Sequence, residues 1–228
     1  MAEDNRFQKR LRGHIVALAS PQGSVARRAE CALIRYYGSR ALDALMAACS
    51  DPSPQVRYRA AYTLGCTRDP RAFDTILALT RDSNGEVRYD ATLALGKLGD
   101  HRAIGPLIAL MSEPDPESCV SSAAALALGE LGVNVLPAVI AAFHHGTPEA
   151  RRLAPSVLAG IGDRAALGPL AELLTDDPGR RLDAMETLAA IGTRECLVLI
   201  DSHRDDESEA VRSAANRIVS SRSAQPVT

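Results

Sequence analysis

The chain has 228 residues, of which 46% are hydrophobic and only 4% aromatic, and its formal net charge is −2. It contains no run of 18 apolar residues, which excludes a membrane-spanning helix. A net charge so close to zero argues against a dedicated nucleic-acid binder. The opening residues MAEDNRFQKR lack the apolar core of a secretory signal, so we expect a cytoplasmic protein.

Positive and negative charges are unevenly distributed along the chain. Residues 1–100 contain 15 Arg or Lys against 11 Asp or Glu, whereas residues 101–228 contain 11 against 17. The first part is therefore formally +4 and the second −6. Contacts with nucleic-acid phosphates would have to come from arginines of the first part, and the acidic second part argues against them.

A ten-residue pattern, V-R-x-x-A-x-x-x-L-G, recurs along most of the sequence. It is clearest in the stretch 82–99, DSNGEVRYDATLALGKLG, and Val87 has counterparts 31 residues earlier and 33 later, at Val56 and Val120. Aligning the pattern places seven alanines in one column: Ala29, Ala60, Ala91, Ala124, Ala154, Ala184 and Ala215. A period of 30 to 33 residues over seven copies is the signature of a solenoid of stacked repeats.

Each repeat is predicted to form two antiparallel helices, A and B, joined by a short turn of Asp, Pro and Ser. Helix A is typified by Arg102–Glu113, whose apolar residues recur at helical spacing. Helix B opens at a proline, carries Val, Ala and Leu four residues apart facing helix A, and is followed by Gly. We expect the alanine column to be buried there. The predicted pairs span residues 5–37, 40–67, 71–99, 102–132, 134–161, 165–191 and 194–220, and residues 221–228 are expected to fray.

Four prolines should modify individual helices. Pro106, Pro137 and Pro169 recur near the same early point of helix A, where they should bend the helix or delay its start. Pro155 lies inside helix B of the fifth repeat and should kink it.

The extended pattern D-P-x-x-x-V-R-x-x-A-x-x-x-L-G resembles the HEAT repeat, specifically the short HEAT-like units of phycobilisome lyases. The resemblance covers nearly the whole chain and implies an all-α fold, a right-handed α–α superhelix of about seven two-helix repeats in one domain, residues 1–228. It also implies a hydrogen-bond ladder between neighbouring repeats, formed by the turn Asp and the helix-B Arg. The matching pairs are Asp51/Arg57, Asp82/Arg88 and Asp206/Arg212. Ser121 and His145 depart from this pattern, so the ladder is expected to be interrupted in mid-chain.

In this architecture helix B lines the concave surface, and we expect four of its positions to point away from the buried stripe. Counted from the valine of the pattern, these are positions +2, +5, +6 and +9. All five tyrosines belong to helices B of the first three repeats, and Tyr58 and Tyr89 share one column. Tyr and Arg dominate binding hot spots, so the sequence predicts a partner-binding surface here. Its expected residues are Arg27, Arg28, Tyr58, Arg59, Tyr62 and Tyr89. The alternative is that the tyrosines only cover the seams between repeats.

Nothing in the sequence predicts a metal or a catalytic site. The five cysteines form no CxxC pair and indicate reduced thiols in a helical core. Adjacent histidines such as His144 and His145 point about 100° apart on a helix, which makes a poor chelate. The acidic runs 176–177 and 205–207 precede helices B, where carboxylates favour the positive helix end. No GxSxG, phosphate-binding glycine loop or HExxH motif occurs.

We therefore expect a non-catalytic scaffold without cofactors, a monomer that binds another protein through an acidic or phenol-compatible surface of that partner. The alternative suggested by the resemblance is a phycobilin-lyase-like or chaperone-like subunit that acts on a tetrapyrrole-carrying partner. Two other enzyme relatives are disfavoured by their chemistry. Deoxyhypusine hydroxylase binds iron through His-Glu dipeptides and DNA-alkylation glycosylases use Trp, and this chain contains neither feature.

Overall fold

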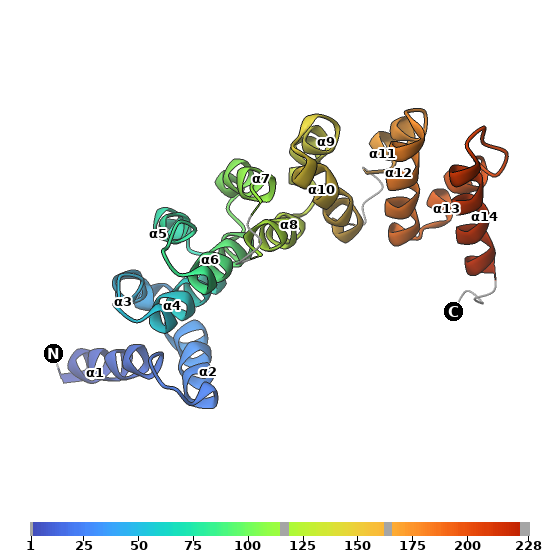
Figure 1. The fold of residues 1–228 in the computed structure, drawn as a ribbon. Helices are drawn as coiled ribbons and strands as arrows, with labels where there is room; N and C mark the ends of the chain where they lie inside the picture. The colour runs from blue at the N-terminus through green and yellow to red at the C-terminus, as the bar shows by residue number, and fades with distance from the viewer. Residues whose placement is uncertain (1, 115–118, 162–165, 224–228) are drawn as a thin grey trace. The chain divides into compact units, whose positions relative to one another are not determined.

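The computed structural model describes residues 2–114, 119–161 and 166–223, and over these ranges it consists of helices, turns and bends without any strand (Figure 1). The all-α fold class is therefore confirmed. The chain divides into two compact units, residues 1–131 and 132–228. The expectation of one continuous domain stays a prediction.

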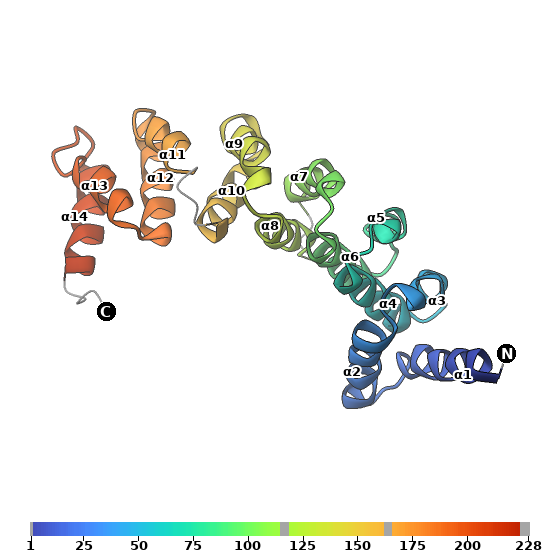
Figure 2. The ribbon, with the colours of Figure 1, turned by 180° about the vertical axis from the view of Figure 1, so that it is seen from behind.

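The first unit contains helices A and B in alternation. The A helices are α1 (Ala2–Ala17), α3 (Leu42–Ala48), α5 (Phe73–Leu79) and α7 (Ile104–Ser112). The B helices are α2 (Gly23–Ala32), α4 (Pro54–Thr67), α6 (Gly85–Leu98) and α8 (Val120–Glu130). Short turns of 3₁₀-helix, η2 (Gly38–Ala41), η3 (Pro70–Ala72) and η4 (His101–Ala103), lead into the later A helices. Helices α4, α6 and α8 lie side by side in one layer, and α3, α5 and α7 form the other (Figures 1 and 2).

The second unit repeats the same plan. It begins with η5 (Gly132–Val135) and pairs α9 (Leu136–His145) with α10 (Pro148–Ile161). The following pairs are α11 (Leu167–Leu173) with α12 (Pro178–Ile191), and α13 (Arg194–Asp201) with α14 (Glu209–Ser223). Helix α14 extends three residues into the segment 221–228 that we expected to fray, and the Ser221 hydroxyl donates to the Ile218 carbonyl at 2.8 Å. Residues 224–228 and residue 165, the expected start of the sixth pair, lie outside the described ranges.

Local sequence explains where the helices begin and end. The Asn84 side chain accepts a hydrogen bond from the Val87 amide at 3.1 Å and caps α6, and Gly99 ends that helix with φ of 75°. The equivalent Gly162 lies outside the described residues. Pro106, Pro137 and Pro169 lie in the first turns of α7, α9 and α11, which agrees with a delayed helix start. Pro155 lies inside α10, as predicted.

The alanine column is buried, as the pattern predicted. Six of its members are fully inaccessible, at 0% exposure: Ala60, Ala91, Ala124, Ala154, Ala184 and Ala215. The valines of the pattern in the second to fourth repeats are buried with them, Val56 and Val120 at 3% and Val87 at 0%. Helix B therefore packs on helix A through the stripe that the sequence indicates.

Helix B also has a second buried face, which the sequence analysis assigned wrongly to the open surface. At positions +5 and +9, Ala61 and Thr92 are fully buried, and so are Gly65 and Gly96. A Cβ added to Gly65 would lie 2.6 Å from the Ala94 carbonyl oxygen, and one added to Gly96 would lie 2.6 Å from the Ala127 Cα. Neighbouring B helices approach so closely that these positions form the seam between them.

The expected Asp–Arg ladder is present between the second and third repeats. The Arg57 guanidinium donates to both carboxylate oxygens of Asp82, from Nε and Nη2, each at 2.8 Å. Its Nη1 donates to the Asp51 backbone carbonyl at 2.9 Å. The carboxylate that pairs with Arg57 therefore belongs to the next repeat, and that of Asp51 instead accepts from the Ser53 amide at 2.8 Å.

A second rung, which the sequence analysis missed, lies in the second unit. Nη2 of Arg181 is 3.4 Å from an Asp206 carboxylate oxygen, and both side chains are largely buried. The sequence analysis looked for an Asp six residues before the helix-B Arg. In the sixth repeat that position is Thr175, so Arg181 was not recognised as part of the ladder.

The seam between B helices predicts a contrast between two glycines. Gly96→Ala should destabilise the protein by about 1–3 kcal/mol because the backbone of Ala127 cannot move aside. Gly105→Ala in α7 is the matched control, since a Cβ there meets nothing within 4 Å. It should leave stability unchanged or raise it by up to about 1 kcal/mol. Urea unfolding measures both, and equal effects of the two substitutions would contradict the close packing of α6 on α8.

The ladder predicts a pH-dependent loss of stability. Hydrogen bonds from Arg57 lower the pKa of Asp82 below its ordinary value of 3.8. The stability from Asp82 is therefore fully present above that value and is lost as the pH falls through the lower folded pKa. At neutral pH, Asp82→Asn should cost about 1–3 kcal/mol, and the difference from wild type should shrink on acidification below about pH 4. Exposed Asp74→Asn is the control, and thermal unfolding at several pH values is the measurement.

Candidate partner-binding surface

The open face of the first unit carries a row of apolar side chains. Position +6 is occupied by Cys31, Tyr62, Leu93 and Leu126 on the successive helices α2, α4, α6 and α8. Cys31 and Leu126 are exposed, Leu126 at 61%, and Tyr62 and Leu93 are half-buried. We call this row the B-helix surface. Exposed apolar side chains such as Leu126 can mark interaction sites, so the row is a candidate for partner binding.

Tyr58 and Tyr89 lie together, as their shared column predicted. Both are half-buried and line one hollow at the start of α6. The same hollow is lined by Glu86 and Asp90. Burial, with the neighbouring carboxylates of Glu86 and Glu30, raises the pKa of Asp90 to about 6. The hollow between the tyrosines therefore presents phenol rings and carboxyl groups.

Arg59 is engaged within the protein. Its side chain is 12% exposed, and Nη1 lies 3.7 Å from a carboxylate oxygen of Glu30 on α2. The guanidinium carbon is 5.7 Å from the centre of the Tyr58 ring. Burial raises the pKa of Glu30, which the charges of Arg59 and Arg27 oppose. Arg59 thus links α2 to α4 and presents only a small part of its side chain to a partner.

Tyr62 on α4 lies beside Lys97 of α6, which in turn pairs with Glu130 of α8. Lys97 on α6 places its ammonium 5.6 Å from the Tyr62 ring centre and 3.2 Å from a carboxylate oxygen of Glu130 on α8. The adjacent Cys66 thiol and burial raise the pKa of Tyr62. The phenol is therefore neutral at physiological pH and acts as an amphipathic contact.

Arg27 and Arg28 lie apart from the tyrosine hollow. They line a separate one with Arg35 and Tyr36, on α2 and on η1 (Leu33–Tyr37), a turn of π-helix that extends α2. Tyr36 is 77% exposed. The structure therefore brings Arg27 and Arg28 to a different aromatic residue from the ones that the sequence analysis selected.

Tyr36 also borders a hollow on its other side. That hollow is lined by Arg6 and Arg10 of α1 and by Arg40, whose guanidinium carbon lies 3.8 Å from the centre of the Phe7 ring. Phe7 in turn packs against Tyr37 with ring centres 5.1 Å apart. Turns of π-helix are rare and occur frequently at functional sites. The sequence signal for this feature is the pair Tyr36–Tyr37 immediately before Gly38, which has φ of 49°.

Tyr36 and the arginines around it form what we call the Tyr36 cluster. All of the arginines are exposed, and in the described part of the chain none of them forms an ion pair. They are Arg6, Arg10, Arg27, Arg28, Arg35 and Arg40. Six neighbouring arginines that form no ion pair in the described residues favour an anionic partner.

The structure gives no arrangement for metal binding in the residues that it describes. No three His, Cys, Asp or Glu side chains there are grouped to hold an ion. His144 and His145 end α9 with ring centres 5.7 Å apart. All five cysteines are free thiols. In the same ranges, every helix is too short or too polar to cross a lipid bilayer.

Comparison with known proteins identifies the repeat type. A sequence profile of the family described as HEAT repeats matches residues 14–95, 73–152 and 136–219, which together cover most of the chain. The phycocyanobilin lyase subunit beta of Nostoc sp. strain PCC 7120 is 35% identical over 101 residues, 44% of this chain and 50% of that protein. The chain thus spans about half the length of this curated relative.

A solved structure of an archaeal protein shows a similar fold. The archaeal HEAT-like repeats protein from Thermococcus onnurineus NA1 aligns with 92% of this chain and 95% of its own, at 16% identity and a TM-score of 0.53. The complex of CpcE and CpcF of phycocyanin lyase from Nostoc sp. PCC7120 aligns with 91% of this chain and 92% of that chain, at 21% identity and a TM-score of 0.48.

The tyrosine hollow can be tested by truncation. Tyr58→Ala combined with Tyr89→Ala should weaken capture of a partner protein from lysate by about tenfold or more, because truncated hot-spot aromatics typically cost at least ~2 kcal/mol of binding. The melting curve should change little. Val198→Ala, at a 63% exposed apolar residue of α13, is the control. Lost stability with retained capture would show that these tyrosines only pack the seams between repeats.

Proposed function

The chain belongs to the family of HEAT-repeat proteins, and on that premise we propose that it is a non-catalytic scaffold whose first unit binds another protein. The observation that carries the proposal is the Tyr36 cluster. Tyr36 is 77% exposed between two hollows whose arginines lack ion-pair partners in the described residues. Arg and Tyr are the side chains that interfaces enrich most, so the cluster supports a protein partner with an acidic surface.

Binding of an acidic partner would relieve the mutual repulsion among the arginines of the Tyr36 cluster. Like charges held close together destabilise the free protein, and a carboxylate-rich partner removes that repulsion on binding. Arg also forms bidentate pairs with carboxylates, which fixes the orientation of the partner. The apolar B-helix surface, with Leu126 at 61% exposure, continues the candidate contact area over later helices of the same unit.

A protein partner is favoured over a nucleic acid. Polyanions are attracted by the charge of the whole chain as well as by a local cluster, and residues 101–228 carry a formal −6. Exposed apolar side chains such as Leu126 also suit a protein surface better than a phosphate backbone. Tyr58, Arg59, Tyr62 and Tyr89 remain proposed contact residues, with Arg59 limited by its pairing to Glu30.

A lyase-like or chaperone-like subunit is the second candidate. It is favoured by the 101-residue similarity to a phycocyanobilin lyase subunit. In that case the partner would be a protein that carries a tetrapyrrole. Co-expression with a bilin-synthesis pathway and a bilin-accepting protein distinguishes the two functions. Pigment attachment that depends on this chain, seen as visible absorbance of the acceptor, supports the lyase-like function, and its absence supports the plain scaffold.

Affinity capture from the native host tests the scaffold proposal. The wild-type chain should retain an acidic protein that is released by salt, because exposed charge pairs are screened. Arg27→Ala, Arg28→Ala and Tyr36→Ala together should reduce capture by about tenfold or more. The matched control is Arg194→Ala, Arg217→Ala and Val198→Ala, which removes two exposed arginines and an exposed apolar side chain from the second unit.

Two results would contradict the proposal. One is equal capture by the cluster variant and the control variant. The other is salt-dependent binding of random DNA by the wild-type chain with no protein retained. That result would indicate that the Tyr36 cluster binds nucleic acid and not protein.

A further inference from the structure

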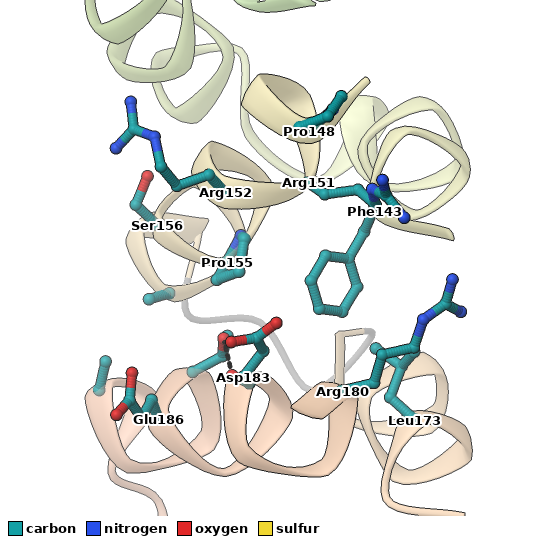
Figure 3. A pocket seen from close by; sticks show the side chains of 13 residues that line it. Phe143, Pro148, Arg151, Arg152, Pro155, Ser156, Leu173, Arg180, Asp183 and Glu186 are labelled. Carbon is teal, nitrogen blue, oxygen red and sulfur yellow. Dashed lines mark hydrogen bonds between the residues drawn. The ribbon is translucent and has the colours of Figure 1, made fainter. Parts of the chain in front are cut away.

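The second unit contains a hollow that is separate from the surface described above. It has a volume of about 600 Å³ and lies between α10 and α12, with contributions from the ends of α9 and α11 (Figure 3). Phe143 and Leu173 lie at its base, 5% and 2% exposed, and Pro155 contributes from α10. The base is therefore apolar, and the hollow is large enough for a bulky side chain of a ligand.

Charged side chains surround this base in an ordered way. On α12, Arg180, Asp183 and Glu186 follow one another at three-residue spacing along the wall of the hollow. Arg151 lies on the facing α10, and Figure 3 shows the Arg151 and Arg180 side chains at the end near Phe143 and Asp183 facing Pro155. Arg152, which pairs with Glu149, lies at the opposite end beside Ser156 (Figure 3). The hollow thus has arginines at both ends and two carboxylates along α12.

Three of these charged side chains lack an ion-pair partner among the residues that the structure describes. Arg180 pairs with Asp176 at 2.9 Å and donates to the His144 carbonyl at 3.3 Å. Arg151, Asp183 and Glu186 form no ion pair in the described residues, although opposite charges stand on facing helices. The open space of the hollow separates them.

The carboxylates of Asp183 and Glu186 repel each other in the free protein. Asp183 and Glu186 are three residues apart on one helix, an arrangement that destabilises a helix when both are ionised. Burial, with the charges of Glu186 and Asp177, raises the pKa of Asp183. A cationic group from a ligand would remove this repulsion, whereas an anion would add to it.

Pro155 removes one backbone hydrogen-bond donor from helix α10 beside the hollow. A proline has no N–H, so the carbonyl of Arg151 lacks the helical donor four residues later. Helix α10 nevertheless continues through this position to Ile161, and Pro155 faces Asp183 (Figure 3). Ser156 still satisfies its own hydroxyl by donating to the Leu153 carbonyl at 2.7 Å.

We propose that the hollow between α10 and α12 binds a segment of a partner protein in which a bulky apolar residue stands between a basic and an acidic residue. The apolar side chain covers Phe143 and Pro155. The basic side chain pairs with Asp183 and Glu186, and the acidic side chain pairs with Arg151. The site uses the second unit alone, so it goes beyond the proposed scaffold surface and stands independently of the Tyr36 cluster.

Other ligand classes fit the hollow less well. A phosphate or another small anion would meet the repulsion of Asp183 and Glu186. A divalent cation would find only these two carboxylates, and no metal-binding group of three is present in the described ranges. A ligand with both charges and an apolar centre would pair with Arg151, Asp183 and Glu186 and would also cover the apolar base.

Selection from a random peptide library on the immobilised full-length chain tests the proposal. Enriched peptides should carry a Lys or Arg and an Asp or Glu flanking Leu, Ile, Met or an aromatic residue. Their affinity, measured with synthetic peptides by fluorescence anisotropy, should fall by about tenfold or more in the double variant Asp183→Asn/Glu186→Gln. Arg151→Ala should weaken binding independently.

Matched controls separate this site from general electrostatics. Glu172→Gln/Glu209→Gln removes two exposed carboxylates that do not line the hollow, and it should leave the affinity unchanged. The triple variant of the Tyr36 cluster should also leave it unchanged, so failure here is distinguishable from failure of the scaffold proposal. The proposal is overturned if no peptide is enriched, if enriched peptides lack a basic residue, or if the Asp183→Asn/Glu186→Gln variant retains its affinity with an unchanged melting temperature.

Discussion

The close approach of neighbouring B helices is the constraint on which the first unit depends. Gly65 lies against Ala94 and Gly96 against Ala127 with no room for a Cβ. Helices α4 and α6 must therefore each bury two faces, one on the A helix through the alanine column and one on the next B helix. The Arg57–Asp82 pair spans the same junction near the helix starts. Small residues bring the helices together, and the charged pair fixes their register.

This packing decides which side chains remain available for binding. In the second and third repeats, positions +5 and +9 are buried in the seam, whereas positions +2 and +6 stay exposed or half-buried throughout the first unit. Because the same positions recur in every repeat, accessible side chains line up in rows across helices, as Tyr62, Leu93 and Leu126 do. A rigid row of this kind presents several contacts at once with little loss of conformational freedom on binding. Residues at the same position of successive repeats therefore form one candidate contact surface.

Charged residues have two distinct roles in this protein. In the ladder, Arg57 and Arg181 are largely buried and neutralised by carboxylates from the next repeat. By contrast, the arginines around Tyr36 stand exposed without ion-pair partners in the described ranges. The same holds for Arg151, Asp183 and Glu186 in the hollow beside Phe143. Exposed pairs contribute little to stability, so charges left unpaired at the surface are free to serve recognition.

The sequence by itself determined the repeat, the helix pairs and the buried stripe, because these follow from local spacing: apolar residues at helical intervals, prolines at helix starts and alanines every 30 to 33 residues. It also placed Tyr58 and Tyr89 together, since equal positions in adjacent repeats are neighbours. Only the tertiary structure decided that Arg59 is engaged by Glu30, that Arg27 and Arg28 surround Tyr36, and that Phe143 lies at the base of a charged hollow. These facts depend on the distance between helices and on the π-helical turn at Leu33–Tyr37, which no periodicity in the chain encodes.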